Sequence, residues 1–73
     1  MARIEAKSLV MGVVAAVEGK VGDRIEGGST IMFIESMKMQ IPVLVEDGGT
    51  LKQVLVKVGD SVSEGQVVAL LET

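Results

Sequence analysis

Lys38 is the residue of this sequence whose type and surroundings could support chemistry. It lies in the segment Glu35-Ser36-Met37-Lys38-Met39 and is the one basic residue between positions 25 and 51. Methionine is soft, flexible and common at recognition surfaces, so a lysine between two methionines could present its amine to a partner. Two ordinary interpretations stay open, because isolated lysines are usually solvated charges and methionines usually fill gaps in a core.

Self-contained catalysis and metal binding are disfavoured by what the 73-residue sequence lacks. It contains no histidine and no cysteine, which removes the usual general base, the commonest metal ligands, thiolate nucleophiles and disulfides. The carboxylates are typical of solvated charges at turns and strand ends, rather than of a catalytic pair in a closed cleft. We therefore expect a protein that is not itself an enzyme, has no metal site and lies in the reducing cytoplasm.

Charge and aromatic content argue against nucleic acid as a partner. Seven basic and ten acidic residues give a formal net charge of −3, which is the wrong sign for neutralising phosphates. Phe33 is the one aromatic residue, so a platform for stacking bases is missing. The uncharged run Ser8–Val17 contains Gly12 and is far shorter than the roughly 20 residues that span a bilayer, so we expect no membrane partner either.

Nine glycines divide the sequence into short segments that favour β-strands over helices. Glu46-Asp47-Gly48-Gly49 is typical of a tight hairpin turn, which predicts that a strand near 41–45 pairs with a strand near 50–56. The stretch from Ser29 to Ile41 contains no glycine or proline. Its apolar spacing leaves a helix open as a minor alternative there.

The sequence contains an internal repeat, in which 12–35 aligns with 49–72 after a shift of 37 residues. Eight of the 24 aligned positions are identical, most clearly Lys20-Val21-Gly22-Asp23 with Lys57-Val58-Gly59-Asp60. A repeated unit predicts one domain over residues 1–73 with pseudo-twofold symmetry, whose halves cover each other's apolar faces. The run 66–71 is typical of a strand, so its counterpart 29–34 is predicted to be a strand too.

These features together resemble the biotinyl and lipoyl attachment domains, and the resemblance covers the whole chain. Glu35-Ser36-Met37-Lys38-Met39 is similar to the Glu-Ala-Met-Lys-Met signature of biotin carboxyl carrier domains. Val21-Gly22-Asp23 with Gly28 before the lysine, and Val58-Gly59-Asp60 with Gly65 after it, match the two glycine-aspartate turns that both kinds of domain share. The closest resemblance is to the small stand-alone biotin/lipoyl attachment proteins of bacteria.

The resemblance implies an all-β fold, a flattened β-barrel or sandwich of two four-stranded antiparallel sheets with the modified lysine on a hairpin turn. It implies covalent attachment of biotin to Lys38. Met37 and Met39 would tune ligase recognition and the behaviour of the biotin, and Glu35 and Ser36 would contribute to ligase recognition. The implied partners are a biotin protein ligase and the biotin carboxylase and carboxyltransferase between which a carrier moves carboxyl groups. Since an exposed lysine ammonium is a poor nucleophile, the ligase must supply the base and the activated biotinyl-adenylate.

Departures from the biotinyl pattern keep two alternatives open. Ser36 stands where most biotinyl domains have alanine, and lipoyl domains commonly read Glu-Ser-Asp-Lys-Ala, so the motif is a hybrid. Met11 replaces a proline that many biotinyl domains have, and the inserted thumb of some carriers is absent. One alternative is therefore a lipoyl carrier for an acyl-transferring dehydrogenase or glycine cleavage, with lipoate on the same lysine and a lipoyl ligase as partner. The other is an unmodified lipoyl-like interaction module, although such segments usually lack the lysine motif.

Overall fold

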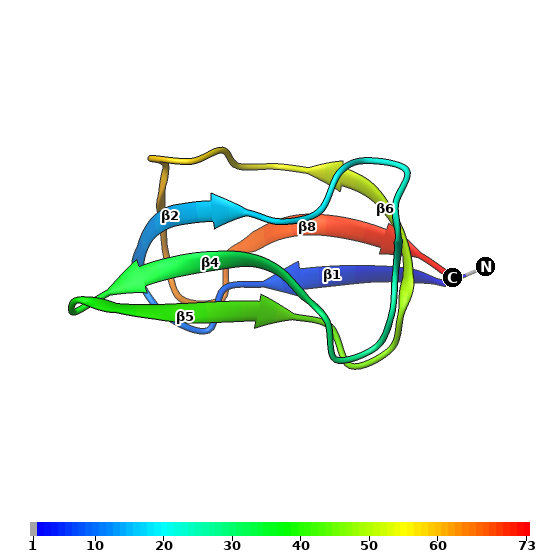
Figure 1. The fold of residues 1–73 in the computed structure, drawn as a ribbon, viewed down its shortest axis with the longest axis horizontal. Helices are drawn as coiled ribbons and strands as arrows, with labels where there is room; N and C mark the ends of the chain where they lie inside the picture. The colour runs from blue at the N-terminus through cyan, green and yellow to red at the C-terminus, as the bar shows by residue number, and fades with distance from the viewer. Residues whose placement is uncertain (1) are drawn as a thin grey trace.

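Residues 2–73, which the computed structural model describes, form eight short strands joined by turns and loops (Figure 1). The strands are β1 (Arg3–Lys7), β2 (Gly12–Val17), β3 (Arg24–Ile25), β4 (Thr30–Ser36), β5 (Met39–Leu44), β6 (Gly49–Val54), β7 (Ser61–Val62) and β8 (Val67–Glu72). The predicted strands at 29–34 and 66–71 correspond to β4 and β8, so the helical alternative for 29–41 is wrong. No helix that could cross a membrane occurs in this described range.

The strands form two four-stranded antiparallel sheets, which confirms the expected all-β fold. One sheet has the order β1-β8-β6-β3 and the other has the order β5-β4-β2-β7. The molecule measures 36 × 18 × 17 Å, and the longer strands run along its long axis (Figure 1). The two sheets therefore make a flattened barrel in which both ends are formed by turns and loops.

The two halves of the sequence repeat are linked across the barrel by backbone hydrogen bonds. A shift of 37 residues relates β2, β3 and β4 to β6, β7 and β8. The N–H of Gly22 donates to the carbonyl of Leu51 at 2.8 Å, and the N–H of Gly59 donates to the carbonyl of Val14 at 2.9 Å. Each glycine-aspartate turn thus bonds to a strand of the other half, so each half satisfies backbone groups that the other half leaves unpaired.

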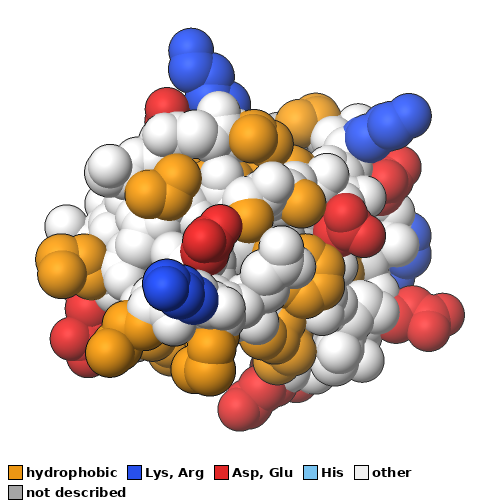
Figure 2. Space-filling model, turned by 60° about the vertical axis from the view of Figure 1, so that its left-hand side comes forward, with side chains coloured by type: hydrophobic (Ala, Val, Ile, Leu, Met, Phe, Trp, Pro, Cys, Tyr) orange, Lys and Arg blue, Asp and Glu red, His pale blue; other side chains and the backbone are white. Residues whose placement is uncertain are grey.

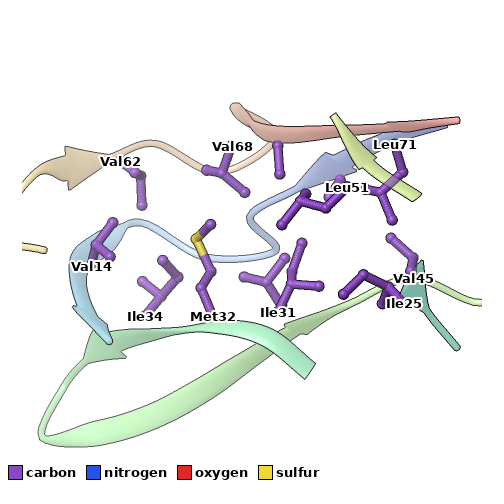
Figure 3. Packing of buried hydrophobic residues seen from close by; sticks show 13 residues of the cluster. Val14, Ile25, Ile31, Met32, Ile34, Val45, Leu51, Val62, Val68 and Leu71 are labelled. Carbon is purple, nitrogen blue, oxygen red and sulfur yellow. The ribbon is translucent and has the colours of Figure 1, made fainter. Parts of the chain in front are cut away.

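The core between the sheets follows the same repeat. Equivalent positions of β4 and β8 are at most 1% exposed: Ile31, Met32, Ile34, Val68, Ala69 and Leu71. Neighbours in sequence are both buried at 31 and 32 because the β4–β5 register shifts between Thr30 and Met32. The buried side chains of β4 point toward Leu51 and Val68 of the other sheet (Figure 3). This apolar contact fixes the position of β4 in the barrel.

The predicted hairpin between 41–45 and 50–56 is wrong. β5 pairs with β4 at the edge of one sheet, whereas β6 lies inside the other sheet, so Glu46-Asp47-Gly48-Gly49 carries the chain between the sheets. Gly48 does not have a positive φ. It is required for a close approach instead, because a Cβ on Gly48 would lie 2.5 Å from the carbonyl oxygen of Ile25. The glycine signal therefore marks contact between two chain segments rather than a hairpin turn.

The turn between β4 and β5 lies at one end of the long axis (Figure 1). Ala2 and Thr73 lie at the opposite end, where the N–H of Thr73 donates to the carbonyl of Ala2 at 2.9 Å. The loop between β1 and β2 lies at the same end as the β4–β5 turn. The hairpin that carries the predicted site residues is thus remote from the two ends of the described chain.

Gly12 allows β2 to lie close against the base of the β4–β5 hairpin. A Cβ on Gly12 would overlap the carbonyl oxygen of Glu35 and lie 2.8 Å from Cγ2 of Ile34. Gly12→Ala should therefore lower the free energy of unfolding by about 2 kcal/mol through overpacking, as measured by urea denaturation. Gly19→Ala is the matched control, because its Cβ would meet the flexible end of Leu51 at 3.1 Å and should cost less. Equal losses for the two variants would contradict this account.

Candidate functional site

Lys38 lies in the two-residue turn that closes the β4–β5 hairpin. The last pair of the ladder is Ser36 with Met39, which leaves Met37 and Lys38 as the turn residues. Their φ angles are 53° and 65°, and positive φ at both central positions is characteristic of a type I′ turn. Such a turn matches the twist of its flanking strands, so the ladder continues to the last residue before the turn.

The turn conformation is unfavourable for the two residues that adopt it. Met37 and Lys38 are the only non-glycine residues with positive φ in the range 2–73. The left-handed conformation costs an L-residue about 1 kcal/mol relative to glycine. Strain of this kind persists only where the surrounding structure enforces it, and it is concentrated at functional sites.

The base of the hairpin is held in the core while its tip is surrounded by solvent. Ile34 on β4 is fully buried and is paired with Val14 on one side and Ile41 on the other. Beyond it, Glu35 is exposed and Ser36 is half-buried. The turn therefore begins three residues after the last anchored side chain of β4, and the backbone of Lys38 is attached to a firm base.

The side chain of Lys38 is exposed and has no protein partner within the described part of the chain. The two ion pairs found among residues 2–73 join Lys7 to Glu5 and Lys52 to Glu72. The side-chain hydrogen bonds of the same range do not involve the Nζ of Lys38. An exposed amine that gives up no hydrogen bond or ion pair, on a turn at the end of the molecule, is accessible for covalent attachment.

Exposed apolar side chains flank this amine. Met37 is 91% exposed and Met39 is 59% exposed. In the β1–β2 loop at the same end of the molecule, Leu9 and Met11 are exposed as well (Figure 1). Figure 2 brings this end forward and shows hydrophobic side chains spread among separate charges. Met37 and Met39 thus place two exposed thioethers directly beside Lys38 in the sequence.

The sequence did not predict that the β1–β2 loop lies at the same end of the molecule as Lys38. Met11 differs from the biotinyl pattern, but this difference does not indicate where the loop lies. Ser8 holds the loop in place: it is fully buried, its hydroxyl donates to the carbonyl of Val10 at 2.6 Å, and its N–H donates to the carbonyl of Gln66 at 2.9 Å. The feature of the sequence that could have indicated this loop is the pair of large apolar residues Leu9 and Met11 shortly before Gly12. Large apolar residues alone do not distinguish an exposed loop from a buried strand.

All five residues predicted to form the site lie on this hairpin. Glu35 and Ser36 end β4, Met37 and Lys38 form the turn, and Met39 begins β5. A flattened barrel of two antiparallel sheets with an exposed lysine at a hairpin tip is the architecture that the resemblance to attachment domains implies. The sequence pattern of the biotin/lipoyl attachment family, described as "Biotin-requiring enzyme", matches residues 4–71. The chain belongs to this family.

Relatives of similar size and much larger relatives both match this chain. It is 46% identical over 52 residues to a biotin/lipoyl attachment protein of Bacillus subtilis, covering 71% of each chain. It is 34% identical over 67 residues to the Mycobacterium leprae homologue of biotinylated protein TB7.3, covering 92% of this chain and 94% of the relative. It is 42% identical over 66 residues to the alpha chain of human mitochondrial propionyl-CoA carboxylase, covering 90% of this chain but 9% of the relative.

Solved structures include the same fold within a carboxylase and as a lipoyl domain. The urea carboxylase of Kluyveromyces lactis superposes with a TM-score of 0.93 at 29% identity, covering 99% of this chain and 6% of that one. The lipoyl domain of the 2-oxoglutarate dehydrogenase complex from Azotobacter vinelandii superposes with a TM-score of 0.73 at 28% identity, covering 97% and 95%. The fold is thus shared by proteins named for each of the two chemistries.

The strain at Met37 gives a prediction about stability. Asparagine adopts the left-handed conformation more readily than methionine, and Met37 is almost fully exposed. Met37→Asn should therefore raise the free energy of unfolding by about 0.5 to 1 kcal/mol in urea denaturation. Met39→Asn is the matched control, because Met39 lies in β5 without a positive φ and should gain nothing. A loss of stability in Met37→Asn would contradict the turn assignment.

Proposed function

We propose that this chain is a carrier domain that receives biotin on Lys38 and moves carboxyl groups between a biotin carboxylase and a carboxyltransferase. The observation that carries the proposal is Lys38 itself, which is exposed, has no ion pair or hydrogen bond among residues 2–73, and lies in the two-residue turn with Met37 and directly before Met39. Membership of the biotin/lipoyl attachment family supports it. So does the similarity to the propionyl-CoA carboxylase alpha chain, to which this chain corresponds over a small part of that protein's length.

Attachment is acylation of an amine. After a base in the ligase removes its proton, Nζ of Lys38 attacks the carbonyl carbon of an acyl-adenylate, an amide bond forms, and AMP leaves. The positive charge of the side chain is lost in this step. Neither histidine nor cysteine is present in the sequence, and no ion pair joins Lys38 to a carboxylate among residues 2–73. The ligase therefore supplies both the activation and the base.

The domain contributes position and recognition to carboxyl transfer, while the attached biotin supplies a ureido nitrogen that accepts and releases carboxyl. The β4–β5 ladder holds the backbone of Lys38 at the tip of a regular hairpin. The lysine stem beyond it is long and free to rotate, so the arm moves while its base stays in place. Such tethering raises the local concentration of the carried group at the second enzyme to roughly the millimolar range.

A lipoyl carrier is the second candidate function. Ser36 fits the lipoyl pattern, and the chain superposes on a lipoyl domain over nearly its whole length. The side chains that a ligase meets beside the lysine favour biotin, because Met37 and Met39 match the biotinyl signature and both are exposed. We therefore place biotin first and lipoate second on the same lysine.

Acylation by purified ligases tests the proposal. Incubation with biotin protein ligase, biotin and ATP should add one biotinyl group, which intact mass and peptide mapping should place on Lys38. Lys38→Arg should abolish this labelling and leave urea unfolding unchanged, because the side chain is exposed and unpartnered. Lys20→Arg, at another exposed turn, is the matched control and should be labelled fully. Labelling of Lys38→Arg would refute the site, and a lipoyl group alone on the unaltered protein would favour the second candidate.

Met37→Asp tests how the flanking residue selects the cofactor. Aspartate occupies this position in the lipoyl pattern and tolerates a left-handed backbone, so the variant should fold. Its acylation rate should fall with biotin protein ligase and rise with lipoyl ligase by about tenfold each, since a charge replaces an exposed apolar contact. Parallel initial rates with the two ligases measure this shift. Unchanged rates with both ligases would show that Met37 does not take part in selection.

A further inference from the structure

Methionines of this chain differ widely in exposure, and two of the three exposed ones among residues 2–73 flank the lysine in the sequence. Met37 is 91% exposed, Met39 is 59% exposed and Met11 is 74% exposed. Met32, by contrast, lies in the core and is 0% exposed. A methionine usually stabilises a protein by filling gaps in the core. Met37 and Met39 contribute little in that way, so their thioethers are available to solutes.

We propose that Met37 and Met39 form a reversible oxidation site that controls the acylation of Lys38. Peroxides are the class of oxidant that the site would meet, and the products are methionine sulfoxides, which methionine sulfoxide reductases convert back to thioethers. The inference rests on the proposed function, because acylation is the process that oxidation would control. The selective oxidation itself depends only on exposure and can be measured separately.

The chemical step is a two-electron transfer of one oxygen atom. A lone pair of Sδ attacks one oxygen of hydrogen peroxide, an S–O bond forms as the O–O bond breaks, and proton transfer releases the other oxygen as water. Sulfur is oxidised by two electrons and the peroxide is reduced by two. Since the step needs access of a peroxide to Sδ, its rate should follow exposure, and the buried Sδ of Met32 should react last.

Oxidation changes the surface that a ligase must contact. A thioether is apolar and flexible, whereas a sulfoxide is strongly polar, chiral and retains water. The two methionines lie on either side of Lys38 in sequence, one within the turn and one at the start of β5. A ligase that brings its adenylate to the Nζ of Lys38 must displace the solvent around both. Two sulfoxides would oppose that displacement without altering the core, because neither side chain is buried.

The test is to oxidise first and acylate afterwards. The unmodified protein is treated with hydrogen peroxide, catalase removes the peroxide, and peptide mass spectrometry locates the added oxygen. Met37 and Met39 should be oxidised before Met32. Biotin protein ligase, biotin and ATP are then added, and the initial rate of labelling should be about tenfold lower than for untreated protein. Treatment with both epimer-specific sulfoxide reductases before the ligase should restore the rate.

Two variants identify the sulfur atoms responsible, each judged by its treated-to-untreated rate ratio. The ratio for Met37→Leu/Met39→Leu should be close to one, whereas Met11→Leu should stay as sensitive as the unaltered chain. An unchanged labelling rate with both methionines oxidised, or oxidation of Met32 as fast as Met37, would overturn the inference and leave the proposed function standing. Failure of the ligase to label untreated protein would refute the proposed function, and with it the control of acylation.

Discussion

The location of Lys38 depends on the pairing register between β4 and β5. Ile34 is fully buried and is paired with Ile41, and a slip of one residue would turn this side chain toward solvent. The same slip would move the turn away from Met37 and Lys38. The apolar core therefore determines which two residues lie at the tip, although its nearest buried residue on β4, Ile34, lies four positions before the lysine. No contact to the lysine itself is needed to place it.

The internal repeat explains why the chain can present a single hairpin from such a small barrel. Corresponding turns and strands of the two halves bond to each other, as Gly22 does with Leu51 and Gly59 with Val14. This reciprocal pairing satisfies the backbone of both halves in a domain that buries little surface in total. β5 and β1 occupy equivalent edge positions in the two sheets. The β4–β5 hairpin joins the two halves. By the symmetry of the repeat it corresponds to the pair β8 and β1, which are hydrogen-bonded but are not joined by a turn.

Parts of the fold that correspond to the internal repeat could be predicted from the sequence. Parts that depend on contact between distant segments could not. The strand at 29–34 followed from its likeness to 66–71, because two copies of one unit must have the same local structure. Glu46-Asp47-Gly48-Gly49 was misread as a hairpin, because local composition does not reveal that Ile25 lies against Gly48. The five residues of the hairpin were predicted from their motif. The exposure of Leu9, in the β1–β2 loop at the same end of the molecule, was not predicted, because it depends on how buried Ser8 fixes this loop.

The two residues of the β4–β5 turn do not follow the local backbone preference for such a turn. Asparagine and glycine suit a type I′ turn best, yet methionine and lysine occupy its two central positions. Glycine in place of the lysine would remove the amine, and a polar residue in place of Met37 would remove the apolar surface beside it. The strain amounts to about 1 kcal/mol for each residue, which is a noticeable part of the stability of a domain this small. The buried base of the hairpin offsets it, and so the core tolerates an unfavourable turn that keeps the lysine and its apolar flanks together at the tip.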